Sequence, residues 1–256
     1  MGSDDLIRAY YQRLGIMIPP KLLPDGETLS ILHRNHVMMI PYENTDYLTR
    51  HITPCDHESQ FREIILKRRG GMCMDNNTLF AELLKAIGYR VTCCSSMICH
   101  RDATQLRTHA MLIVEDDMGV CWWCDVANPF FRYSEPIPFA EDKEFSVPGG
   151  MLRIEKDMQG KYVLSKKEHG AWSDTFRIEH EGVTTEDLNE IKYSIMTKYP
   201  ANHLCFQEVF SIVTPEGRRT LNGTIYRESA AERLYQYEVP SEYMPWAYAQ
   251  FGLSKL

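Results

Sequence analysis

Cys73, His109 and Asp125 are the residues of this sequence whose types and settings could carry covalent chemistry. Cys73 follows the Gly70-Gly71 pair and begins a segment whose apolar residues recur at helical spacing. Unpaired backbone N–H groups and the positive end of a helix dipole both stabilise a thiolate at such a position. Taken alone, the segment fits a nucleophilic thiol and a small buried apolar cysteine about equally well.

His109 lies near the start of an apolar segment at 107–115, and Asp125 closes a second one at 120–126. The sequence Glu-Asp-Asp-Met-Gly between them predicts a hairpin turn. Opposite residues of a hairpin sum to a constant, so positions near 110 should face positions near 125. We therefore expect His109 and Asp125 side by side. The carboxylate would orient the imidazole, and the imidazolium would hold Cys73 as a thiolate.

Each of these residues also has a purely structural explanation. A strand histidine is more often a hydrogen-bonded core residue, and an acid at a strand end more often forms a turn. Their joint placement favours chemistry, because Cys, His and Asp together form the set used by thiol acyl-transfer enzymes.

The surrounding elements divide the chain by periodicity. Helices are predicted at about 4–14, 28–39, 59–68, 73–87 and 185–197. Residues 40–46 form an irregular segment with more polar groups than a linker needs, although an ordinary turn would also explain it. From residue 89 the pattern becomes strand-like and predicts an antiparallel sheet or small barrel. The strands are expected at 89–98, 107–115, 120–126, 152–155, 162–165, 172–178, 206–214 and 219–227, with a short packed helix within 241–256.

Composition limits the partners and the compartment. The chain has 256 residues, 44% of them hydrophobic, and a net charge of −7, which argues against nucleic acid as a partner. It has no apolar run of 18 residues, and its N-terminus carries acids where a signal peptide carries bases. We expect a cytoplasmic protein without a membrane partner; the sequence leaves its oligomeric state open.

The eight cysteines fit reduced thiols better than a disulfide framework. Cys121 and Cys124, with Cys93, Cys94 and Cys99 upstream, offer zinc ligands as an alternative. Residues three apart on a strand point to opposite faces, which disfavours that alternative. We therefore expect no metal.

The sequence resembles the arylamine N-acetyltransferases over about residues 8–227. The most specific match is Arg68-Arg69-Gly70-Gly71-x-Cys73, followed by Asn77. Further matches are Pro41-Tyr42-Glu43-Asn44, Thr108-His109, Asp125-Val126, Tyr199-Pro200-Ala201-Asn202-His203 and Thr214-Pro215-Glu216-Gly217-Arg218.

This resemblance implies an α+β fold with an N-terminal helical bundle (1–88), a central antiparallel β-barrel (89–182) and a C-terminal α/β lid (183–256). It implies Cys73 as nucleophile, His109 as base and Asp125 as orienting acid. Acetyl-CoA or another short acyl-CoA would be the donor, and a small aromatic amine or hydrazine the acceptor. The residues expected to bind substrate or cofactor are Tyr42, Thr108, Ala127, Asn128 and His203.

One departure leaves alternatives open. The family usually has Asp-Val-Gly-Phe-Gly where this chain has Asp125-Val126-Ala127-Asn128-Pro129, so we expect a reshaped wall beside the site. A thiol hydrolase or transglutaminase-like enzyme would use the same three residue types. A catalytically weak family member acting as a binding module is the third alternative. The 36-residue gap from Cys73 to His109 disfavours the papain-like branch.

Overall fold

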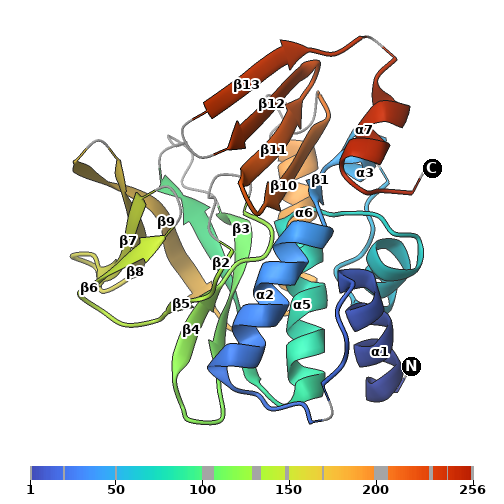
Figure 1. Ribbon diagram of the computed structural model, residues 1–256. Helices are drawn as coiled ribbons and strands as arrows, with labels where there is room; N and C mark the ends of the chain where they lie inside the picture. The colour runs from blue at the N-terminus through green and yellow to red at the C-terminus, as the bar shows by residue number, and fades with distance from the viewer. Residues whose placement is uncertain are drawn as a thin grey trace.

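The structure is a computed structural model. It contains a helical part, a large curled sheet and a smaller second sheet (Figure 1). The residues that it describes are 2–19, 21–49, 51–99, 107–128, 134–147, 150–168, 170–198, 207–230, 233–240 and 242–254.

The N-terminal part is helical, as the periodicity predicts. Its elements are α1 (Ser3–Leu14), α2 (Gly26–Met39), α3 (Thr45–Leu48), α4 (His57–Gln60), the π-helix η1 (Phe61–Leu66) and α5 (Cys73–Ile87). Two boundaries differ from the prediction. The helix α2 begins two residues earlier, because Asp25 caps it by accepting from Thr28 N at 2.8 Å. The helix predicted at 59–68 is instead α4 followed by η1.

Eight strands of the described residues form the large antiparallel sheet, in the order β5-β4-β3-β2-β9-β8-β7-β6, which curls into a nearly closed barrel. The strands are β2 (Arg90–Ile98), β3 (Arg107–Glu115), β4 (Cys121–Cys124), β5 (Ile137–Pro138), β6 (Lys143–Val147), β7 (Gly150–Lys156), β8 (Tyr162–Glu168) and β9 (Ala171–Glu181). The sequence prediction missed β5 and β6. In the β3–β4 hairpin Leu112 faces Cys124, one residue from the expected register.

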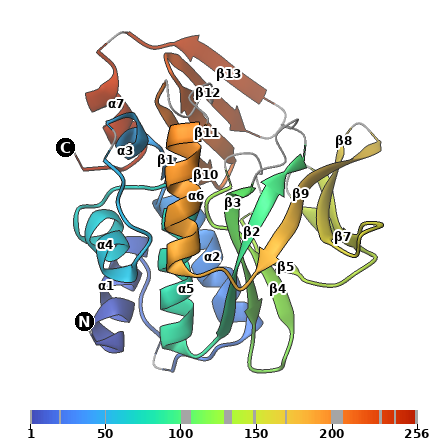
Figure 2. The same ribbon diagram turned by 180° about the vertical axis from the view of Figure 1, so that it is seen from behind.

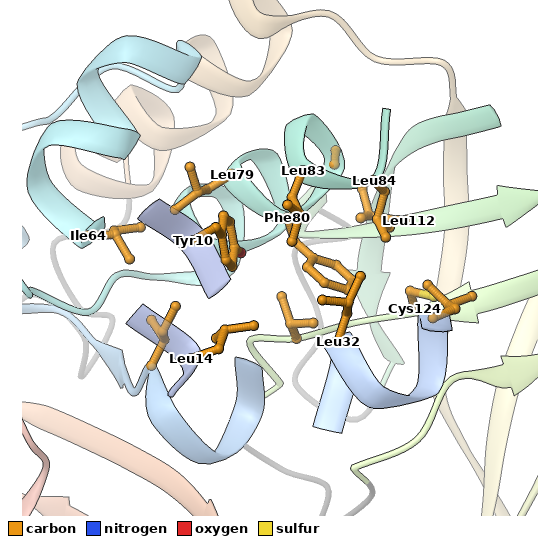
Figure 3. Packing of buried hydrophobic residues seen from close by; sticks show 14 of the residues in the cluster. Tyr10, Leu14, Leu32, Ile64, Leu79, Phe80, Leu83, Leu84, Leu112 and Cys124 are labelled. Carbon is orange, nitrogen blue, oxygen red and sulfur yellow. The ribbon is translucent and has the colours of Figure 1, made fainter. Parts of the chain in front are cut away.

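The helical core and the sheet share their apolar residues. Figure 3 shows Tyr10, Leu32 and Phe80 converging with Leu112 of β3 and Cys124 of β4. All five are nearly or fully buried. Because α5 packs directly on β2 and β3, its first turn is held close to the start of β3.

The C-terminal part contains α6 (Thr185–Lys198), β10 (Val209–Thr214), β11 (Gly217–Asn222), β12 (Ile225–Ala230), β13 (Arg233–Glu238) and α7 (Met244–Gln250). The strands β10 to β13 form the second sheet together with β1 (Tyr42–Glu43), which pairs with β10. The strand predicted at 219–227 is wrong, because the chain turns at Gly223, whose φ of 56° suits glycine. The Asn222-Gly223 dipeptide is the signal for this turn in the sequence.

The α+β fold class is confirmed: a helical part, an antiparallel barrel and a mixed C-terminal part follow one another along the chain. Figure 2 shows α6 crossing the back of the molecule, where it packs against β3. The division at residues 88 and 182 stays a prediction. No helix among the described residues is long and apolar enough to cross a membrane.

Candidate active site

Cys73 is the first residue of α5, and its thiol faces the start of β3. Its Sγ lies 3.9 Å from the carbonyl oxygen of Thr108, and the residue is 3% exposed. The Asp75 carboxylate caps the N-terminal end of α5 by accepting a hydrogen bond from Met72 N at 2.9 Å. The position therefore combines a buried thiol with the N-terminus of a 15-residue helix.

The segment before Cys73 is fixed by close backbone packing. A Cβ on Gly70 would lie 2.3 Å from the carbonyl oxygen of Pro41, which explains why glycine is required there. Arg69 Nη2 donates to Glu43 Oε1 at 2.8 Å, and both side chains are buried. Glu43 N in turn donates to Gly71 O at 3.1 Å. The irregular segment at 40–46, whose polar groups exceed what a linker needs, thus holds the cysteine loop in place.

His109 lies between the thiol and Asp125. Its Nε2 is 2.7 Å from Asp125 Oδ2, it has a side-chain hydrogen bond with Cys73, and its ring stacks on Phe176 at 4.5 Å. Burial alone would lower the pKa of His109. The charges of Asp125 and Cys73 and the hydrogen bonds to both outweigh it, and they raise this pKa to about 10. The imidazole is therefore protonated at neutral pH.

The Asp125 carboxylate, directly after β4, is buried and accepts four hydrogen bonds. Oδ2 accepts from His109 and from Asn128 Nδ2 at 3.0 Å. Oδ1 accepts from Asn77 Nδ2 at 3.0 Å and from Ala127 N at 3.2 Å. Burial opposes the charged form, but the interaction with His109 and the other donors lower the pKa of Asp125. The acid is therefore ionised beside the imidazolium.

Asn77 is a site residue to which sequence reasoning gave no role. Besides Asp125, its Nδ2 donates to Ala110 O at 2.9 Å, and its Oδ1 accepts from Val126 N at 3.1 Å. The available signal was its spacing: residues four apart share a helix face, so Asn77 lies one turn below Cys73.

His33 on α2 contacts the main chain of Asp125. Its Nε2 accepts from Asp125 N at 3.3 Å, which requires the tautomer in which Nδ1–H donates to Ser134 O at 2.9 Å. Burial lowers the pKa of His33, so the ring is neutral and suited to accepting. No sequence pattern pointed to this residue.

Of the five residues expected to bind substrate or cofactor, three lie around one cavity. Tyr42, Ala127 and Asn128 line a cavity of about 20 Å³ next to Asp125. Thr108 contributes its carbonyl oxygen to the thiol, whereas the Asn128 amide is directed at Asp125. The predicted His203 lies outside the described residues.

A family model described as N-acetyltransferase matches residues 25–245. The chain belongs to the arylamine N-acetyltransferase family. It is similar to the arylamine N-acetyltransferase / N-hydroxyarylamine O-acetyltransferase of Salmonella typhimurium, at 27% identity over 96% of this chain and 88% of that protein. The match to the Escherichia coli relative is 28% identical and covers 60% of this chain and about half, 54%, of that protein.

Solved structures of the family share the fold. The Salmonella typhimurium enzyme superposes with a TM-score of 0.88 at 24% identity, covering 97% of this chain and 91% of that one. The Mycobacterium marinum enzyme in complex with CoA gives 0.87 at 18% identity, covering 96% and 92%. The chain is therefore an acyltransferase by family, as the resemblance of its motifs predicted.

Of the cysteines considered as zinc ligands, Cys93 and Cys94 lie on β2 and Cys121 and Cys124 on β4, and β3 separates the two strands. Cys124 packs in the helical core and Cys94 in the barrel core. The seven cysteines within the described part of the chain are free thiols. In the same part of the chain no group of three or more His, Cys, Asp or Glu side chains is arranged to hold a metal ion.

Proposed function

We propose that Cys73, His109 and Asp125 transfer an acyl group from acetyl-CoA to a small aromatic amine or hydrazine in two displacements. The observation that carries the proposal is the chain of contacts from Asp125 Oδ2 through His109 to the Cys73 thiol. In that chain Asp125 holds the imidazolium, and the imidazolium stabilises the thiolate. The family is named for acetyl transfer to arylamines, and an activated cysteine can carry such a transfer through an acyl-enzyme.

In the first step the Cys73 sulfur attacks the thioester carbonyl carbon and forms a C–S bond. The bond to the CoA sulfur then breaks, and the departing thiolate takes the proton of His109. In the second step the amine nitrogen attacks the acyl-cysteine, His109 removes the proton from that nitrogen, and the Cys73 thiolate leaves. After the first step Cys73 and His109 are both uncharged, and the second step restores the Cys73 thiolate and the His109 imidazolium with which the cycle began.

The Asn128 amide and the Ala127 N–H have a role in this scheme through Asp125, because both stabilise its ionised form. Tyr42 lines the same small cavity as Asp125. We propose the cytoplasm as the compartment of this reaction.

The test is incubation with acetyl-CoA in the absence of amine, followed by intact-mass measurement and peptide mapping. One acetyl group should appear on Cys73, and adding an aniline should remove it. The variant Cys73→Ser should stay unlabelled. Full turnover with an unlabelled Cys73 would contradict the proposal. Peptide cleavage or crosslinking without CoA would favour the thiol hydrolase alternative.

A second measurement tests Asp125. The substitution Asp125→Asn places an amide N–H₂ among four donors, so His109 loses its acceptor and the correct orientation. By analogy with other triads, kcat should fall by about 10³- to 10⁴-fold while circular dichroism shows a folded protein. An activity within a few-fold of the wild type would remove Asp125 from the mechanism.

A further inference from the structure

Lys192 of α6 is a fully buried cation beside the nucleophile helix. The residue is 1% exposed, and its Nζ lies 2.5 Å from Asp75 Oδ1 and 2.5 Å from the carbonyl oxygen of Thr53. Lysine is almost never buried to this degree unless an anion compensates its charge. The partner here is an acid two residues after Cys73.

Asp75 has two tasks that divide its oxygens. Oδ2 accepts from Met72 N at 2.9 Å and so caps the N-terminus of α5, which begins at Cys73. Oδ1 accepts from Lys192 Nζ and from Gln60 Nε2 at 2.8 Å. The carboxylate is therefore fixed on both sides, and its position fixes the first turn of α5.

A carboxylate at this place creates an electrostatic difficulty. It caps the helix well, but it places a negative charge in the same helical turn as the sulfur that attacks the acyl donor in the proposed function. His109 carries a positive charge on the β3 side. On the Asp75 side, within the described residues, the cation in contact with the carboxylate is Lys192.

We infer that Lys192 is a positioning residue for the chemistry of Cys73, because its ammonium cancels the charge of the Asp75 cap. The inference rests on the proposed function of Cys73. It also ties α6, in the C-terminal part, directly to the first turn of the nucleophile helix. The cap can then be an acid without weakening the nucleophile.

The experiment measures the rate of Cys73 alkylation by iodoacetamide at pH 7 in four proteins: wild type, Lys192→Met, Asp75→Asn and the double variant. The expected loss in Lys192→Met is about fivefold or more, because the buried carboxylate is left uncompensated. Asp75→Asn, which removes the anion and keeps the shape, should react at least as fast as wild type. The double variant should recover to within about twofold, since neither charge remains.

The matched control is Lys85→Met on α5, the helix that begins with Cys73, where the lysine is half exposed and pairs with Glu82. Its alkylation rate should equal that of the wild type. A merely structural role for Lys192 predicts that Lys192→Met and Asp75→Asn are both slow and that the double variant is no faster. That result would overturn the inference, as would a wild-type rate in Lys192→Met. If Lys192→Met does not fold, Asp75→Asn and the double variant still decide.

Acetyl labelling separates this inference from the proposed function. If wild-type Cys73 takes no acetyl group from acetyl-CoA, the proposed function fails. If the wild type is labelled and the four alkylation rates do not follow the charges, only the role of Lys192 fails.

Discussion

Asn77 Nδ2 lies 3.0 Å from Asp125 Oδ1, and this contact joins the helix that begins with Cys73 to the acid that follows β4. The same amide also reaches the main chain of β3 at Ala110 and of the loop at Val126. One side chain thus sets the distance between the elements that carry the three proposed catalytic groups.

Replacing Asn77 with alanine should therefore affect both stability and activity. Three buried polar groups lose a partner, which should cost about 2–4 kcal/mol of unfolding free energy. The value of kcat/KM should fall at least about tenfold, because a displacement of α5 misaligns the Cys73 thiol. Urea unfolding and acetylation assays measure the two effects. Asn35→Ala, which removes an exposed amide bonded to Ile31 O, should change neither, and equal behaviour of both variants would contradict the role of Asn77.

The buried pair of Arg69 and Glu43 should matter mainly for folding. Its side chains are 7% and 2% exposed, and removing one partner leaves a buried charge uncompensated. Arg69→Gln should lower the free energy of unfolding by about 3–5 kcal/mol. The exposed pair of Arg34 and Glu135 provides the comparison, and Arg34→Ala should cost less than about 1 kcal/mol. Similar losses in the two variants, measured by urea unfolding, would refute the buried-pair explanation.

His36 should make the fold sensitive to acid. Burial, and after it the neighbouring His33, lower the pKa of His36 to about 3, against 6.5 for an exposed histidine. The unfolded chain then binds a proton that the folded chain refuses, so stability falls as pH drops from about 6.5 towards 3. His36→Gln removes the titration and keeps an acceptor for Tyr10, whose hydroxyl lies 2.6 Å from His36 Nδ1. Between pH 7 and 4.5 it should lose less stability than wild type in urea; a parallel loss would disprove this.

The sequence was sufficient where local rules decide the geometry. Helical spacing and Gly88 set the extent of α5, so Cys73 was correctly expected at its start. Hairpin arithmetic was sufficient to bring His109 and Asp125 together, although the register was off by one residue. The shift in register did not change the prediction that the two side chains meet. Asp125 lies just beyond the end of β4, and four hydrogen bonds direct its side chain.

The supporting residues could not be predicted in this way. Lys192 meets Asp75 across 117 residues, and His33 meets Asp125 across 92. Such contacts depend on how α6 and α2 pack on the sheet, which no local pattern encodes. A lysine within a predicted helix is normally solvated, so the sequence alone gave no reason to bury it.

His109 should give the opposite pH dependence to His36. Its pKa is about 10 in the folded protein and about 6.5 in an unfolded chain, so the folded state binds the extra proton between these values. The stability from its interactions with Asp125 and Cys73 is therefore complete below about pH 6.5 and is lost as pH rises through 10. His109→Gln should flatten the decline of the urea midpoint between pH 7 and 9.5. Parallel curves for the two proteins would show that no proton is held at His109, and the imidazolium needed to protonate the leaving CoA would then be absent.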